Sequence, residues 1–202
     1  MKLYTSYTSP YARIILLTAL AEGRDSLQLD YADPWITPPE LTAVNPLSQV
    51  PALITDEGTV IDGSLPILDF LFDHPIKTAV QHAVTGYAYA LLDQTVKAYS
   101  LARFQPEHTP EHPHIERARQ AVIRGLQHCP QLDDSINHPA HFALGMALSY
   151  TELRHPQLFR HLSDANRQAF ERFQNRPDVR TVAIAQLEKR PATVAELRHL
   201  PL

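Results

Sequence analysis

The chain contains few of the residues on which several classes of protein depend. It has a single cysteine, Cys129, so an intramolecular disulfide framework and a multi-cysteine zinc site are both excluded. It has no basic excess, and the formal net charge of -4 disfavours nucleic-acid binding through a positive surface. No apolar run approaches membrane-spanning length. We therefore expect a soluble, cytoplasmic protein whose partners include neither nucleic acid nor a membrane.

Glycine is also scarce, with 6 residues against 17 prolines, while 44% of the chain is hydrophobic and can supply a sizeable core.

Residues 1–75 alternate between strand and helix signals. Strands are predicted at MKLYTSY, LQLDY, PALIT and TVID, and helices at SPYARIILLTALAEG, PPELTAVNP and SLPILDFLFD. Ser9 and Ser64 are the expected N-caps of two of these helices. The order β-α-β-α-β-β-α predicts a four-stranded mixed sheet with helices on its faces.

Strand signals cease after residue 75. A long amphipathic helix is predicted over residues 79–104, and further helices at IERARQAVIRGLQHC, HFALGMALSYTELR, SDANRQAFERFQNR and PDVRTVAIAQLEK. The third of these five is apolar nearly all round, which is typical of a buried central helix. Residues 76–202 therefore read as an all-α bundle of about five helices.

Pro51 stands directly before an expected strand, where a proline removes a ladder hydrogen bond. Around it, the order of QVPAL, a DG-S helix start, FERFQNRPDVRTVA and an early TSPYAR turn resembles the cytosolic glutathione S-transferase superfamily. The version SYTSPYAR is similar to bacterial serine-type members. The resemblance implies an α/β thioredoxin-like glutathione-binding domain at 1–75 and an all-α domain at 76–202. It also implies glutathione as co-substrate, no metal, and a homodimer.

The resemblance gives Pro51 a role. It implies a cis peptide bond before this proline, with the N–H and C=O of Val50 paired to the cysteinyl backbone of glutathione like an added strand. The alternative is that Pro51 only shapes the start of a strand in a fold that has lost its ligand. By the same analogy, Gln49 contacts the glycyl part of glutathione, or else is a solvent-exposed turn residue.

Ser9 is the candidate for stabilising the thiolate of glutathione. Lowering a thiol pKa from about 8.5 by two units needs about 2.7 kcal/mol. A helix N-terminus supplies up to ~2 kcal/mol and a hydrogen bond to a charged group roughly 1.5–3, so both together suffice. Ser9 sits where both are available, although it could also be a plain N-cap. Tyr7 and Tyr11 are neighbouring hydroxyls that could substitute for it.

Ser64 is expected to hold the γ-glutamyl carboxylate of glutathione at a helix start. Related proteins usually place an acid immediately before this serine, to hold the ammonium group. This chain has Gly63 there, with Asp62 one residue earlier. Gly63 could let Asp62 turn inward, another acidic group could serve, or glutathione could bind weakly. These three alternatives stay open at the level of sequence.

The start of the central helix also departs from the resemblance, which implies a Ser/Thr-x-x-Asp capping box. His138 and His141 occupy those positions. Because a protonated histidine would face the positive end of a helix, we predict that stability falls below about pH 6.

Other residues carry weaker signals. The histidines of EHTPEHPH are separated by prolines and predict no metal site. Arg13 is expected in a solvent or interface salt bridge, with ligand contact as the alternative. Trp35 could border the ligand or fill the domain junction. Tyr99 and Arg103 on the long helix are candidate substrate-site residues.

Two classes of function follow from the resemblance. The first is a transferase that adds the glutathione thiolate to a small electrophile held between the two domains. The alternative is a non-catalytic or regulatory member of the fold that binds proteins. Glutathione-dependent peroxide or disulfide reduction is disfavoured, because position 9 is serine rather than the cysteine that a protein mixed disulfide requires.

Overall fold

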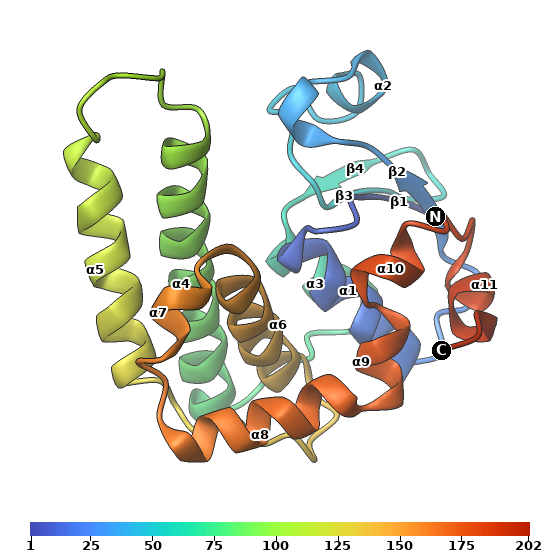
Figure 1. Cartoon of the computed structure of the whole chain (residues 1–202). Coiled ribbons are helices and arrows are strands. Elements are labelled where there is room, and N and C mark those ends of the chain that lie inside the picture. The colour runs from blue at the N-terminus through green and yellow to red at the C-terminus, as the bar shows by residue number, and fades with distance from the viewer.

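The computed structural model describes all 202 residues, and its first part is a four-stranded mixed sheet with helices on its faces (Figure 1). The strands follow the spatial order β2-β1-β3-β4, with β1 parallel to β2 and antiparallel to β3. Their bounds are β1 Lys2–Thr5, β2 Gln28–Tyr31, β3 Ala52–Ile54 and β4 Val60–Asp62. The helices are α1 Pro10–Ala21, the 3-10 helix η1 Pro34–Ile36, α2 Pro39–Thr42 and α3 Ser64–Leu71. This is the predicted thioredoxin-like fold.

Alternation along the strands divides the first domain into two apolar layers. Leu3 of β1 lies opposite Leu53 of β3, and both belong to the large core that contains α1 and α3. Tyr4 lies opposite Ala52, and these two join Leu41 of α2 in a second, smaller cluster. Because side chains alternate between the faces, the register also decides which face each residue at the cleft edge of the sheet presents.

The second part is helical from residue 79 onward, and residues 72–78 link it to α3. It contains eight helices rather than the predicted five. Two of the additional helices, α7 and α10, have four residues each, and α11 has six. Proline opens both α7 and α9, which agrees with its preference for the first helical position. The bounds are α4 Ala79–Arg103, α5 Pro113–Gln127, α6 Pro139–Arg154, α7 Pro156–Phe159, α8 Asp164–Asn175, α9 Pro177–Thr181, α10 Ile184–Leu187 and α11 Val194–His199.

The last helices lie against the first domain rather than completing a separate bundle. Figure 1 shows α9, α10 and α11 beside α1 and the sheet. The chain near Ala192 follows the outer edge of β2, where Leu29 N–H donates to the Ala192 carbonyl at 2.9 Å and Gln28 forms a bridge with Thr193. The otherwise open edge of the sheet is thereby covered, which removes a site for unwanted strand pairing.

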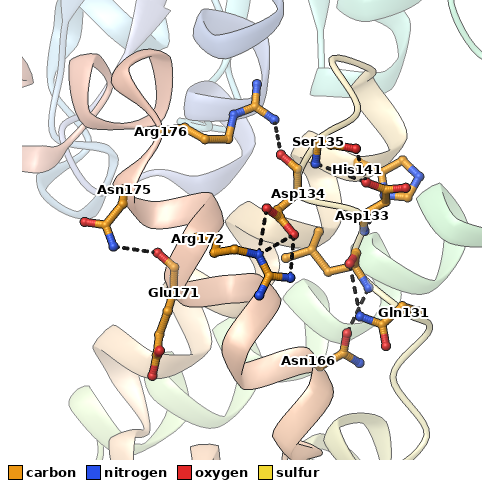
Figure 2. Close-up of polar contacts among 11 residues, drawn as sticks. Gln131, Asp133, Asp134, Ser135, His141, Asn166, Glu171, Arg172, Asn175 and Arg176 are labelled. Atoms are coloured by element: carbon orange, nitrogen blue, oxygen red, sulfur yellow. Dashed lines mark hydrogen bonds and ion pairs between the residues drawn. The ribbon is translucent and has the colours of Figure 1, made fainter.

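Helix α6 is the buried central helix that the sequence predicts, and two histidines organise its start. His138 is the N-cap, and its Nδ1 accepts from the Ala140 N–H at 3.1 Å. His141 does not complete a capping box. Its Nδ1 accepts instead from the Asp133 N–H at 3.2 Å, as Figure 2 shows. Both contacts require an unprotonated Nδ1.

The segment before α6 is held against α8 by further polar contacts (Figure 2). Arg172 of α8 forms an ion pair with Asp134 at 2.9 Å, and Arg176 donates to the Asp134 carbonyl at 2.8 Å. The side chain of Asn166, also on α8, is buried and accepts from the Leu132 N–H at 2.8 Å. These contacts fix the N-terminal end of α6, whose other end reaches the candidate site.

None of the helices has an apolar stretch long enough to span a bilayer.

Candidate functional site

A cleft of about 1110 Å³ separates the first domain from the helices α4 to α6. Its lining includes six of the predicted site residues: Ser9, Gln49, Val50, Pro51, Gly63 and Ser64. Three other predicted residues, Asp62, Tyr99 and Arg103, are absent from the lining. The fold thus brings together three segments of the first domain that lie far apart in the sequence, and it excludes part of the expected set.

Ser9 combines a capping contact with exposure to the cleft. Its Oγ accepts from the Ala12 N–H at 3.2 Å, so the expected N-cap of α1 is present. A hydroxyl has one proton to donate and two lone pairs, so this contact leaves the proton free for an acceptor in the cleft. Pro10 follows at the first helical position. The capping and thiolate-stabilising roles are therefore compatible in one residue.

The cleft also exposes a free pair of backbone groups at Val50. The Val50–Pro51 peptide bond is cis, as the resemblance implies. Val50 precedes β3, and neither its N–H nor its C=O has a hydrogen-bond partner in the chain. A free donor and a free acceptor on one residue match what an extended peptide needs in order to pair as an added strand.

The start of α3 forms the next part of the same wall. Ser64 is buried at 4% exposure, and the first N–H groups of a helix have no partner within it. Ser64 is not the predicted N-cap but the first residue of α3, because Gly63 occupies the N-cap position with φ 83°. A side chain at position 63 would be strained in this backbone conformation.

Asp62 does not compensate for the missing acid. It lies opposite Ala52 in the β3–β4 register and is exposed, and its side chain does not line the cleft. Of the three alternatives for holding the ammonium group, an inward turn of Asp62 is not the one that the structure adopts.

Asp93 of α4 is the one carboxylate that lines the cleft, and the sequence reasoning missed it. It accepts a hydrogen bond from the Tyr11 hydroxyl at 2.5 Å, which joins α1 to α4 across the cleft. Burial, together with this bond and the charge of Asp93, raises the pKa of Tyr11 well above its usual range. The Tyr11 proton is thus committed to Asp93, which leaves Ser9 as the better-placed donor to a thiolate.

Tyr89 lies near Asp93 and Ser64, and its buried hydroxyl has no hydrogen-bond partner. It lies one helical turn before Asp93 on α4, and burial raises its pKa to about 12. The Ser64 hydroxyl lowers that pKa while the Asp93 carboxylate raises it, so Tyr89 lies near both groups. Tyr89, Asp93, Lys97 and Ser100 recur at helical spacing and line one face of α4. That spacing is the signal in the sequence that could have identified this wall.

Aromatic and basic side chains complete the second wall. Trp35 borders the cleft and also contacts Phe104 at a ring-centroid distance of 5.3 Å, so both of its predicted roles are correct. Tyr150 of α6 lines the floor, and His112 and His114 line the cleft at the start of α5. The histidines do not belong to any cluster that could hold a metal ion.

Three other residues have structural positions. Arg13 is buried and forms no salt bridge, so that expectation was wrong. Its Nε donates to the Val182 carbonyl at 2.8 Å, and burial lowers its pKa to about 10. Cys129 is half-buried, and burial raises its pKa to about 12, which disfavours the nucleophilic thiolate. Tyr7 packs on Tyr31 at 5.4 Å between ring centroids and does not line the cleft.

Comparisons with known proteins agree with this geometry. Residues 8–74 match the family model of the glutathione S-transferase N-terminal domain. The structure is similar to a glutathione transferase family member from Pseudomonas fluorescens Pf-5 with bound glutathione, with a TM-score of 0.79 and 22% identity over 90% of this chain and 98% of that chain. A search of curated protein sequences finds no significant match.

Two further solved structures have a similar fold. A glutathione S-transferase from Methylobacillus flagellatus with glutathione bound has a TM-score of 0.71 and 26% identity, over 90% of this chain and 98% of that one. Gtt2 from Saccharomyces cerevisiae has a TM-score of 0.69 and 21% identity, over 90% and 100% of the two chains. Residues 8–74 therefore resemble the N-terminal domain of glutathione S-transferases, and the whole chain shares the fold of these solved structures, as predicted, while the serine-type subclass stays a prediction.

Proposed function

We propose that the protein is a glutathione transferase, which binds glutathione in the first-domain wall of the cleft and adds its thiolate to a small electrophile. The observation that carries the proposal is the free N–H and C=O of Val50 in a cleft shared with Ser9 and the start of α3. Val50, Ser9 and the start of α3 would each contact a different part of glutathione. Solved structures of similar fold contain bound glutathione, which supports the same assignment.

The parts of glutathione follow from the chemistry of the wall. Val50 pairs with the cysteinyl backbone, and Gln49 is available to the glycyl end. The γ-glutamyl carboxylate accepts hydrogen bonds from the Ser64 hydroxyl and from the N–H groups that begin α3, where a helix favours negative charge. The thiol then lies toward Ser9, at the start of α1.

Asp93 takes the place of the acid that Gly63 lacks. The α-ammonium of the γ-glutamyl group is adjacent to the carboxylate held by Ser64, and Tyr89 lies near both Ser64 and Asp93. Asp93 is the one acidic side chain in the cleft, and an unpaired ammonium there would lack a counter-charge. This assigns the second of the three sequence alternatives, in which another acidic group serves.

Catalysis consists of holding the thiol as an anion beside the electrophile. The Ser9 hydroxyl donates to the sulfur, and the N-terminus of α1 adds a favourable field. The thiol proton leaves to solvent, and the sulfur lone pair forms the new bond. Ser9 touches the reacting atom and is therefore the proposed catalytic residue.

The first experiment is calorimetric titration with reduced glutathione at pH 7. The wild type is expected to bind in the micromolar to low-millimolar range, and Ser64→Ala is expected to bind at least fivefold more weakly. Ser26→Ala is the matched control, because Ser26 is exposed and away from the cleft. If neither the wild type nor the variants bind, the non-catalytic alternative, a protein-binding module, replaces the transferase.

The remaining parts of the proposal concern assembly and location. The homodimer is proposed from the resemblance alone. The presence of only one cysteine supports a reducing, cytoplasmic location.

A further inference from the structure

Two arginines meet at the end of the second wall, on either side of one tyrosine hydroxyl. Arg103 of α4 donates to the Tyr99 hydroxyl oxygen at 3.0 Å, and Arg154 of α6 donates to the same oxygen at 3.1 Å. Because both guanidinium groups bond one atom, their nitrogens cannot lie farther apart than these two distances together. Like charges at that separation repel each other.

No carboxylate of the chain offsets this pair. Neither Arg103 nor Arg154 takes part in an ion pair, although both lie close to acidic side chains in the sequence. Glu111 pairs with Arg119 at 2.6 Å and Asp93 accepts from Tyr11, so these two acids are engaged elsewhere. The Nε of Arg154 is buried and has no hydrogen-bond partner. A buried donor without a partner is uncommon and marks an unfilled contact.

Aromatic rings connect the arginine pair to the cleft. The guanidinium carbon of Arg103 lies 5.7 Å from the centroid of the Trp35 ring, and that of Arg154 lies 5.3 Å from the centroid of Tyr150. Trp35 and Tyr150 both line the cleft. Arg103 and Arg154 therefore lie next to rings that line the cleft, although neither arginine belongs to the lining itself.

Lys97 adds a third positive charge, on the face of α4 that lines the cleft. It lines the cleft one helical turn after Asp93 and forms no ion pair. The electrophile half of the cleft therefore combines flat aromatic surfaces with three cations that lack a carboxylate partner. A planar molecule that carries an anionic group satisfies both features at once.

We infer that the second substrate of this protein is an aromatic electrophile bearing a carboxylate, with its ring against Trp35 and Tyr150 and its carboxylate toward Lys97 and the Arg103–Arg154 pair. The inference rests on the proposed transferase function for the reaction and on the arginine–aromatic cluster for the choice of substrate.

An aryl chloride is one example of such an electrophile. The glutathione thiolate forms a carbon–sulfur bond at the ring carbon that bears chlorine. The carbon–chlorine bond then breaks, and chloride leaves with the electron pair. The carboxylate takes no part in the chemistry and serves only to orient the ring.

A matched pair of electrophiles tests the inference. The two are 4-chloro-3,5-dinitrobenzoate, which is anionic, and neutral 1-chloro-2,4-dinitrobenzene. The expected wild-type ratio of kcat/KM, anionic over neutral, exceeds tenfold. Arg103→Gln and Lys97→Met are each expected to lower that ratio about tenfold, and Arg103→Lys is expected to retain most of it. The control is Arg117→Gln, an exposed arginine of α5 that forms no ion pair, which removes the same charge elsewhere.

A binding measurement separates this inference from the transferase activity. Trp35 is the only tryptophan of the chain, so its fluorescence reports the cleft directly. Unreactive 3,5-dinitrobenzoate is expected to quench it at a concentration at least tenfold lower than 1,3-dinitrobenzene does, and Arg103→Gln should remove most of that advantage.

The outcomes distinguish the two proposals. Selective binding of the anion without conjugation of either electrophile would support the anion site and overturn the transferase. Conjugation of both electrophiles at equal rates, unaffected by Arg103→Gln, would support the transferase and overturn the anion site. Equal binding of the two nitroaromatics would also overturn the anion site.

Discussion

The two walls of the cleft recognise their ligands by different means. The wall from the first domain presents backbone groups of Val50, the small hydroxyls of Ser9 and Ser64, and the ends of two helices. The wall from the second domain presents large side chains, among them Tyr150 and Lys97. Backbone recognition tolerates many changes of side chain, whereas aromatic and ionic recognition does not. The first wall therefore suits a constant co-substrate, and the second determines which electrophile is accepted.

Ser9→Ala should reduce activity more than any other change to the first wall. Ser9→Ala removes a hydrogen bond to an anion, worth roughly 1.5–3 kcal/mol, and should lower kcat/KM for conjugation about 10- to 150-fold. The pH profile of kcat/KM should shift upward, because the bound thiol then ionises at higher pH.

Ser9→Thr is the control for this change, since it keeps both the hydroxyl and the N-cap. Ser9→Ala also loses the cap of α1, at about 1 kcal/mol, so its thermal midpoint must be measured in parallel. Activity of Ser9→Ala within twofold of the wild type would contradict the catalytic role.

The next change is expected to lower the stability of the helices behind the second wall. Gly145 of α6 packs on the fully buried Phe173 of α8, and an added Cβ would lie 2.3 Å from that ring. Gly145→Ala should therefore destabilise the protein by about 1–3 kcal/mol through overpacking, as measured by urea unfolding.

Gly86→Ala on α4 is the matched control. Nothing lies within 4 Å of the added Cβ, and glycine costs a helix interior about 0.5–1 kcal/mol relative to alanine, so this variant should be slightly more stable. Equal stability of the two alanine variants would show that the close approach of α6 and α8 is not a constraint.

A third change tests whether Asp93, a residue of the second wall, helps to bind glutathione. Asp93→Asn keeps an acceptor for the Tyr11 hydroxyl but removes the charge, and it should weaken glutathione binding about tenfold in calorimetry. Tyr11→Phe removes the hydrogen bond but keeps the charge, and its effect should be several times smaller.

The ligand supplies the control for this assignment. Glutaryl-cysteinyl-glycine lacks the α-ammonium of glutathione, so Asp93→Asn should not weaken its binding. An equal loss of affinity for both ligands would mean that Asp93 acts only by positioning Tyr11.

The smallest effect concerns the histidines that hold α6, away from both walls. Burial is the main cause that lowers the pKa of His141 and of His155 below the usual value near 6.5. Below that value the unfolded chain binds more protons than the folded one, so stability is full above about pH 6.5 and is lost as pH falls. The thermal midpoint should therefore be lower at pH 5 than at pH 7.

His141→Asn tests the source of this pH dependence. Asparagine can still accept from the Asp133 N–H but does not titrate, so the variant should show a smaller decrease between pH 7 and pH 5. A wild-type midpoint that stays constant from pH 8 to pH 5 would contradict the prediction.

Local patterns in the sequence predicted helix starts near Ser9 and Ser64 and a strand after Pro51. The resemblance to a known family, rather than these patterns, assigned the three residues to a binding site. Asp93 was missed because its helical spacing with Tyr89 and Lys97 defines a face of α4 but not what that face meets. Its position in the cleft depends on Tyr11, which lies 82 residues earlier in the chain.

The β-α-β-α-β-β-α order and the helical second half could be read from the sequence, because they depend on periodicity, caps and prolines within short segments. Three features required the folded chain: Asp62 does not line the cleft, α9 and α11 pack on α1, and Arg103 and Arg154 share the Tyr99 hydroxyl. These outcomes depend on strand register and on the packing of helices distant in sequence, and no local pattern encodes either of them.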